Sequence, residues 1–167
     1  GRHVAAPMVY GNTVVVGSHQ TGLQGITISP DGDGFKAEPV WKNIEAQPNI
    51  THGVRVGGHY YGIGDPAKLV CVDISSGKTT WSDNSLFFPD PKRAMAAFIV
   101  MGKNIITLSS GGELCLFEAS ATEFNELGRT QVCGINWCLP AYVDGRLFVR
   151  DGIKKKGGNL ICLDLTD

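Results

Sequence analysis

The sequence lacks both long apolar runs and a surplus of charge of one sign. Its apolar stretches, such as 94–100 and 105–108, are far too short to cross a bilayer, so we expect no transmembrane helix. The formal net charge is −1, which argues against a nucleic-acid-binding protein. With 43% hydrophobic and 19% charged residues, the 167-residue chain has the composition of an ordinary folded protein.

Signatures of catalysis and of metal binding are also missing. The sequence contains no P-loop, dinucleotide fingerprint, HExxH or GxSxG string. DGDG at 31–34 superficially resembles a calcium loop, but it lacks the third carboxylate and the distal Glu, and it lies where a turn between strands is expected. The four histidines do not cluster with the cysteines in sequence, so we expect no metal site.

What the sequence does contain is an internal repeat in four copies. Each copy opens with an apolar run, a turn that contains glycine and a second apolar run, which predicts a β-hairpin. The four hairpins read PMVYGNTVVVGS from Pro7, VRVGGHYYGIGD from Val54, FIVMGKNIITLSS from Phe98 and AYVDGRLFVRDG from Ala141. Their polar turn residues, Asn12, His59, Lys103 and Arg146, are 47, 44 and 43 residues apart. This period is typical of four-stranded propeller blades.

A third apolar run follows each hairpin. The runs are LQGITIS from Leu23, LVCVDIS from Leu69, ELCLFEAS from Glu113 and LICLDLT from Leu160. Aligned without gaps, they place a small residue in one column (Gly25, Cys71, Cys115, Cys162) and an aliphatic residue in the next (Ile26, Val72, Leu116, Leu163). Small residues beside large ones allow neighbouring sheets to interdigitate.

A fourth run closes the first three repeats. In the first two it ends in Trp41 and Trp81, and Gly77 within SSGKTTW is expected to supply the positive φ of a tight turn. In the third repeat we expect Leu127 to replace the tryptophan. At this recurring position the tryptophans are interpreted as blade-to-blade packing residues and not as ligand contacts.

These strings resemble the repeats of pyrroloquinoline-quinone-like (PQQ-like) β-propellers. KLVCVDISSGKTTW from Lys68 is similar to their GKLVCLDLKTGEVLW-like strings, and PAYVDGRLFVRDG followed by NLICLDL looks like the last blade of large bacterial propellers. The resemblance implies an all-β fold of four four-stranded antiparallel blades, the last without its outer strand. They would form the C-terminal part of a seven- or eight-bladed, quinoprotein-alcohol-dehydrogenase-like ring.

The predicted organisation is therefore a single partial propeller domain over residues 1–167. The blades are expected at about 4–46, 47–92, 93–135 and 136–167. Helix should be confined to a turn or so in the connections at 83–92 or 119–126.

The five cysteines are then placed by the repeats. Cys71, Cys115 and Cys162 are expected to act as small apolar residues, held apart by the packing of the intervening sheets. Cys133 and Cys138 flank Gly134 in a connection between blades. They form either a local disulfide in an oxidising compartment or a pair of reduced thiols, and both alternatives stay open.

The resemblance leaves function open, because PQQ-like repeats occur in quinoprotein dehydrogenases, outer-membrane assembly lipoproteins and many proteins with no assigned activity. Our leading hypothesis is a non-enzymatic binding or scaffold module for a protein or polymer partner, in the periplasm or outside the cell. No cofactor is expected, since the adjacent cysteines and calcium-binding acids of the dehydrogenases are not recognisable. The alternatives are a quinoprotein fragment, with PQQ- and calcium-binding residues in missing blades, and a structural module of a longer secreted protein.

Candidate binding residues lie where each innermost strand begins, because propeller ligands tend to bind where such loops converge at the axial channel. Asn49 and His52 could instead only satisfy backbone groups of their loop. Arg150 is a further candidate, because its column carries Val16, Ile63 and Thr107 in the other repeats and a charge there needs a partner or a solvent-exposed position. The complete set is His3, Asn49, His52, Arg93, Asn136, Trp137 and Arg150.

The strand count predicts an incomplete ring. The fourth repeat stops after its third strand at 160–165, and only residues 1–4 precede the first inner strand. The last sheet would then expose an unpaired apolar edge, and the first and last blades would each expose a packing face. We expect either further blades upstream or a second copy of the chain as the partner that covers these surfaces.

Overall fold

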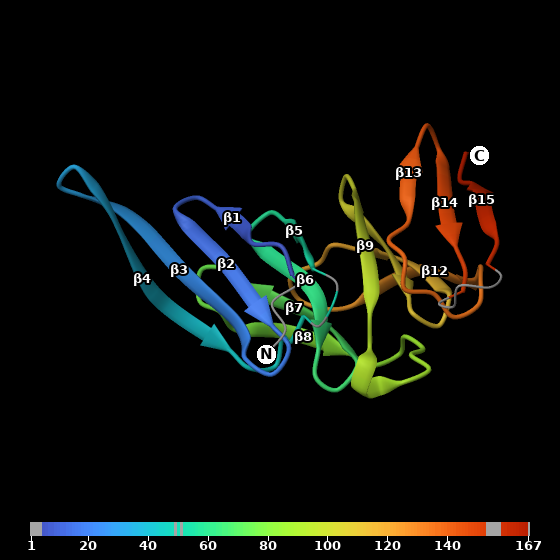
Figure 1. Cartoon of the computed structure of the whole chain (residues 1–167), viewed down its shortest axis with the longest axis horizontal. Helices are drawn as coiled ribbons and strands as arrows, with labels where there is room; N and C mark the ends of the chain where they lie inside the picture. Colours follow the sequence, from blue (N-terminus) through green and yellow to red (C-terminus); the bar gives the residue numbers. More distant parts are fainter. Residues whose placement is uncertain (1–4, 49, 51, 153–157, 167) are drawn as a thin grey trace.

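The chain forms four antiparallel β-sheets that follow one another in sequence order, from blue to red in Figure 1. The computed structural model describes residues 5–48, 50, 52–152 and 158–166. Sheet 1 contains β1 (Met8–Tyr10), β2 (Thr13–Ser18), β3 (Gly22–Asp31) and β4 (Gly34–Asn43). Sheet 2 contains β5 (Val54–Val56), β6 (His59–Gly64), β7 (Lys68–Asp73) and β8 (Thr79–Asp83). Sheet 3 contains β9 (Ala96–Met101), β10 (Asn104–Ser109), β11 (Glu113–Glu118) and β12 (Asn125–Gln131). Sheet 4 contains β13 (Ala141–Val143), β14 (Arg146–Arg150) and β15 (Leu160–Asp164).

This architecture confirms the predicted fold class. Every sheet is an antiparallel meander, and the fourth has three strands where the others have four. The only helical segment among the described residues is a single 3₁₀ turn, η1 (Pro91–Arg93), in the connection between β8 and β9. No helix in the described part of the chain is long and apolar enough to span a membrane.

Two-residue turns join the first two strands of every sheet. In sheets 1 and 3 the turns are Gly11-Asn12 and Gly102-Lys103, and their glycines have φ of +57° and +62°. In sheet 4, Asp144 and Gly145 both have positive φ, at 48° and 75°. Such left-handed residues match the twist of the flanking strands, which is why glycine and Asp-Gly occur here.

Strand pairing shows that the gapless sequence alignment is wrong by one residue in the third repeat. The residues that follow the four turns are Thr13, His59, Asn104 and Arg146, whereas the sequence comparison used Asn12 and Lys103 for the first and third. Two residues further along, their strands pair with Gly25, Cys71, Leu116 and Cys162. Leu116, and not Cys115, is therefore the structural counterpart of Cys71.

The same shift corrects the prediction for the third tryptophan position. Trp41 pairs with Gly25 and Trp81 with Cys71, in each case immediately after the bulged residue of the outer strand. In sheet 3 the residue that pairs with Leu116, immediately after the bulged residue, is Gly128. Leu127 lies in the bulge and is 51% exposed, so it does not replace the tryptophan.

Both tryptophans pack between sheets, as predicted. The Trp41 ring contacts the neighbourhood of Gly77, whose φ is +71°, and its Nε1 donates to the Ile74 carbonyl at 2.8 Å. Nε1 of Trp81 donates to the Ser120 carbonyl at 2.9 Å. The Trp81 ring also lies within 6.4 Å of the rings of Tyr61, Phe117 and Phe124. An indole thus anchors sheet 1 to sheet 2 and another anchors sheet 2 to sheet 3.

The hydrophobic core consists of layers between successive sheets. Val15 and Leu23 of sheet 1 meet Val70 and Val72 of sheet 2. The layer between sheets 2 and 3 includes Cys71 and Cys115, so two cysteines that were expected to be held apart share one layer as free thiols. The layer between sheets 3 and 4 contains Ile106, Leu108 and Leu114 with Leu147 and Val149.

The β3–β4 hairpin is longer than the others and projects from the body of the molecule at the left of Figure 1. Its strands pair from Leu23 with Asn43 out to Asp31 with Gly34, and all residues from Gly34 to Val40 are exposed. The DGDG string forms its tip, where Gly32 has φ of +58°. The interpretation of this string as a turn is confirmed.

Candidate functional site

The connections between sheets gather at one edge, opposite the short hairpin turns, which point upward in Figure 1. We call the segments 44–48, 84–95 and 132–140 the loop edge. Backbone hydrogen bonds tie these segments to the ends of the second strands and to the turns that follow them. Gln47 N donates to Ile63 O in β6 at 3.1 Å, Ser110 N to Met95 O at 2.8 Å, and Asn136 N to Ser110 O at 3.1 Å. The loop edge is therefore fixed by the sheets and is not a set of free loops.

Asn136 has a structural role at this edge. Its side chain is 3% exposed, and Nδ2 donates to the Ser109 carbonyl at 3.0 Å. Because a buried amide that is already hydrogen-bonded to the backbone has little left to offer a ligand, Asn136 positions the 132–140 segment. His52 is exposed near the start of β5. Arg93 belongs to η1, and its side chain is outside the described part of the structure, as are His3 and Asn49 altogether.

Trp137 belongs to the 132–140 segment, and Arg150 lies beside this segment. Trp137 is 47% exposed, and Nη1 of Arg150 lies 3.5 Å from Sγ of Cys138 in the same segment. The pairing of Arg150 with Leu160 puts it in one column with Gly17, Ile63 and Leu108, so the predicted counterparts Val16 and Thr107 are wrong by one residue. Arg150 is exposed, as expected for a charge in an apolar column.

Of a set of exposed apolar side chains on the loop edge, sequence reasoning found only Trp137 and missed the other four. All are large, and each of the three segments contributes at least one. They are Ile44, Phe87, Ile135, Trp137 and Leu139, with exposures from 47% to 68%. The sequence did contain a signal for them: a large apolar residue in a connection between strands, where the alternation of a strand does not require one.

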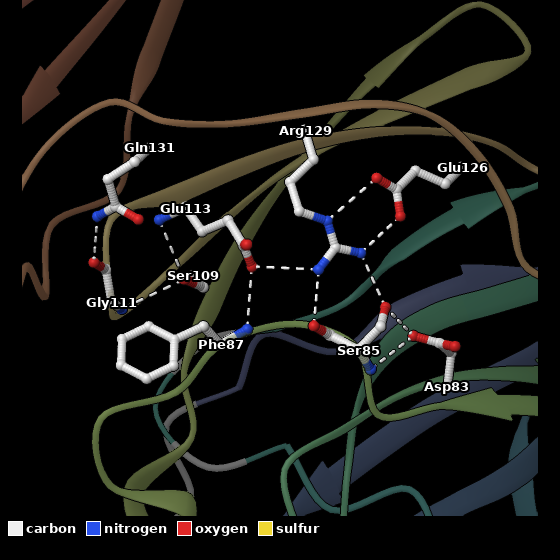
Figure 2. Close-up of polar contacts among 9 residues, drawn as sticks. All are labelled: Asp83, Ser85, Phe87, Ser109, Gly111, Glu113, Glu126, Arg129 and Gln131. Atoms are coloured by element: carbon white, nitrogen blue, oxygen red, sulfur yellow. Dashed lines mark hydrogen bonds and ion pairs between the residues drawn. The ribbon is translucent and has the colours of Figure 1, made fainter.

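Arg129 holds the 84–95 segment of the loop edge against sheet 3 (Figure 2). Its Nη1 donates to the Ser85 carbonyl at 2.6 Å and lies 3.4 Å from Oε2 of Glu113. Nη2 donates to Glu126 at 2.6 Å and to the Ser85 hydroxyl at 2.8 Å. The hydrogen bond to Glu126 and the charge of Glu113 raise the pKa of Arg129.

Glu113 extends this network to Phe87. Its Oε2 accepts a hydrogen bond from the Phe87 backbone N at 2.9 Å, and the Phe87 ring packs over Gly111, where a Cβ would lie within 2.5 Å of the ring. Gln131 closes the other side by donating to the Gly111 carbonyl at 2.7 Å (Figure 2). Because its polar groups are mutually satisfied, the cluster positions Phe87 and does not resemble a catalytic centre.

Within the described ranges, no three His, Cys, Asp or Glu side chains converge so that they could hold a metal ion. All five cysteines are free, so Cys133 and Cys138 are a pair of thiols in this structure.

Comparisons with known proteins bear on the fold. No protein-family model matches the sequence, and no curated protein matches it significantly. Among solved structures, BamB from Moraxella catarrhalis has a TM-score of 0.61 at 13% identity, over 86% of this chain and 39% of BamB. AztD from Citrobacter koseri has a TM-score of 0.59 at 18% identity, over 98% of this chain and 44% of AztD. A europium-containing methanol dehydrogenase has a TM-score of 0.53 at 14% identity, over 77% of this chain and 24% of the enzyme.

These similarities show a β-propeller fold. The chain spans less than half of the length of each of these three proteins. At such low identity the likeness extends to the arrangement of strands and carries no residue of a site from one protein to another.

Proposed function

We propose that this chain is a non-enzymatic propeller module that binds an apolar segment of a protein partner at its loop edge. The observation that carries the proposal is the set of large apolar side chains exposed on all three connections between sheets. Scattered exposed apolar residues are ordinary on protein surfaces, whereas several of them on one edge are typical of an interaction surface. Tryptophan is typical of the residues that dominate binding energy.

The rigidity of the loop edge supports this proposal. Phe87 is held through Glu113 and Arg129, and the segment with Trp137 is held through Asn136. Loops that are fixed before binding lose little conformational entropy when a partner docks. Arg150 lies beside the same segment and would place one positive charge next to the exposed apolar side chains of the loop edge.

The test is affinity selection of a random peptide library on the immobilised chain, followed by fluorescence polarisation with an enriched peptide. We expect enriched peptides to carry apolar residues. The double substitution Trp137→Ser and Leu139→Ser should weaken their binding at least about tenfold. Phe35→Ser is the matched control, because Phe35 is 80% exposed on the β3–β4 hairpin, away from the loop edge.

Two results would overturn this function. One is the absence of any enriched sequence. The other is a double variant that binds the enriched peptides within twofold of the original chain while circular dichroism shows that both are folded.

We also propose that the chain holds no cofactor of its own. The proposal is supported by the lack of converging metal ligands among the described residues and of adjacent cysteines in the sequence. Calorimetric titration with pyrroloquinoline quinone and calcium should give no saturable heat at micromolar concentrations. Saturable binding would favour the alternative, a fragment of a quinoprotein dehydrogenase.

We further propose a periplasmic or extracellular location, as the resemblance to PQQ-like propellers implies. Fractionation of cells that express the complete gene provides the test. Recovery of the protein only with cytoplasmic markers would exclude this location.

A further inference from the structure

The two indoles that anchor sheet 1 to sheet 2 and sheet 2 to sheet 3 define a repeated position in the fold. Trp41 and Trp81 each enter the gap from the outer strand of one sheet. Each donates its Nε1 proton to a backbone carbonyl just after the third strand of the next sheet, at 2.8 Å to Ile74 and 2.9 Å to Ser120. The gap between sheets at this height therefore has the shape and the hydrogen-bond acceptor that an indole requires.

The gap between sheets 3 and 4 has the same architecture without the indole. Gly128 occupies the tryptophan position, and a Cβ built there would meet no heavy atom within 4 Å. A cavity of about 410 Å³ lies here. Its wall is mainly apolar and includes Met101, Ile106, Leu114, Leu116 and Leu165.

Polar groups in the wall of this cavity suit a ring that carries an N–H. Leu165 follows β15 as Ile74 follows β7, and both backbone N–H groups donate to the second residue of a hairpin turn, Gly145 and Gly58. The Leu165 carbonyl is thus the counterpart of the acceptor that Trp41 uses. Asn104 also lines the cavity, and its buried Oδ1 has no hydrogen-bond partner among the described residues.

We propose that the cavity beside Gly128, between sheets 3 and 4, is a binding site for an indole ring. The volume is within the range of small-molecule sites, and an apolar wall with a few polar groups is their usual composition. This site would hold an indole ring of another molecule, whereas the two preceding gaps hold the indole rings of the chain's own Trp41 and Trp81. This site is separate from the loop edge and does not depend on the function proposed there.

The experiment uses indole itself as the probe, with the 167-residue chain and ligand-detected NMR. A ligand of this size is expected to bind with a dissociation constant on the order of 0.1–1 mM. 1-Methylindole, which lacks the N–H donor, should bind severalfold more weakly because it cannot donate a hydrogen bond to an acceptor in the cavity wall. N-acetyl-tryptophanamide distinguishes the source of the ring: binding equal to that of indole indicates a tryptophan side chain of a peptide, and binding of indole alone indicates a free small molecule.

Gly128→Trp tests the position, since it restores the side chain that sheets 1 and 2 carry. We expect it to abolish indole binding and to raise the Tm, because the new ring fills the cavity. Leu127→Trp is the matched control: it adds a tryptophan at the exposed neighbouring position and should change neither binding nor Tm. If Gly128→Trp does not fold, Gly128→Leu partly fills the cavity and should weaken binding at least fivefold. Failure of the original chain to bind indole, or unchanged binding by a folded Gly128 variant, would overturn the proposal.

Discussion

The five cysteine side chains differ sharply in their surroundings. Cys71 and Cys115 are completely buried in the layer between sheets 2 and 3, whereas Cys162 is exposed on sheet 4. Burial raises the pKa of the Cys71 thiol and raises that of Cys115 to about 11. Since the thiolate is the reactive species, these two groups are protected both by protonation and by packing.

We therefore predict an order of thiol modification. With iodoacetamide near pH 8, Cys162 should be alkylated first, and Cys71 and Cys115 should react only after denaturant is added. Peptide mass spectrometry over time measures this order, and a Cys162→Ser variant should lose the fast phase. Labelling of Cys115 as fast as Cys162 in the folded chain would contradict the placement of Cys115 in the core.

Asp73 is the acceptor that organises the tight turn after β7. Its Oδ1 accepts hydrogen bonds from the Ser75 hydroxyl at 2.6 Å, the Ser76 backbone N at 2.7 Å and the Ser76 hydroxyl at 2.8 Å. These bonds, that from Ser75 first, lower the pKa of Asp73, and His59 at 3.8 Å adds to the effect. The charged carboxylate is thus favoured in the folded state.

The consequence for stability has a definite sign. A carboxyl group whose pKa is depressed by folding stabilises the folded state above its unfolded-state pKa of about 3.9, and this contribution is lost as the pH falls through the folded-state value. Asp73→Asn should therefore be less stable than the original chain at pH 7, and the difference should shrink towards pH 3. Urea unfolding at both pH values measures it, with Asp33→Asn in the exposed hairpin tip as control. A difference that stays constant between pH 7 and pH 3 would exclude this role.

At the scale of elements, the indole anchors should dominate the coupling between sheets. Trp81 touches three aromatic rings and donates a hydrogen bond across the gap to sheet 3. Trp81→Ala should lower the free energy of unfolding by about 3–5 kcal/mol. Trp137→Ala is the control, because half-exposed Trp137 should cost far less. Urea denaturation measures the free energy of unfolding of both variants. Equal losses of this free energy would show that the Trp81 anchor contributes no more than an exposed tryptophan.

The succession of strands could be predicted from the sequence because glycine turns and alternating apolar residues recur in every repeat. The register within a repeat could not. Asn12 and Lys103 are second residues of their turns, whereas His59 and Arg146 follow theirs, so similar letters marked different positions. That single-residue error made three assignments wrong together: those of Cys115, of Leu127 and of the column that contains Arg150. The pairing of strands reveals this error, and it also reveals the bulge at Leu127 in β12, which is invisible in the sequence pattern.

The candidate site was only partly predictable for a related reason. Trp137 and Arg150 were found because a large aromatic or a charge in an unusual place is conspicuous in one sequence. Asn136 was also found, but its position in the loop could not show that its amide is used within the chain. Phe87 and Ile44 look like ordinary core residues until the structure shows them exposed.

At the scale of the whole molecule, the outward face of sheet 4 corresponds to the face of sheet 2 that sheet 3 covers. Leu160 is 74% exposed there, while the equivalent Leu69 of sheet 2 is 1% exposed beneath sheet 3. Arg150, Phe148 and Cys162 share this face through their pairing. An apolar sheet face and an open strand edge of this kind normally require a cover.

We predict that the isolated 167-residue chain self-associates at high micromolar concentration, through this face or through the opposite face of sheet 1. Further blades would supply the same cover in a longer protein. Light scattering measures the association, and Leu160→Lys should reduce it whereas Phe35→Lys should not. A soluble monomer that unfolds cooperatively at these concentrations would show that the faces need no partner.

The projecting β3–β4 hairpin has a further consequence for how the molecule opens. Its outer half is held by backbone pairs from Ile28 with Ala37 to Asp31 with Gly34, and it has exposed side chains on β4 and no sheet packed beyond it (Figure 1). Segments with few buried contacts unzip locally at a small fraction of the global unfolding free energy. In hydrogen–deuterium exchange, amides of this outer half should exchange early, while those of β6 and β10 should persist until the whole domain unfolds. Equal protection of the two groups of amides would contradict this. If protection is unequal, exchange in the hairpin measures partial opening separately from global unfolding.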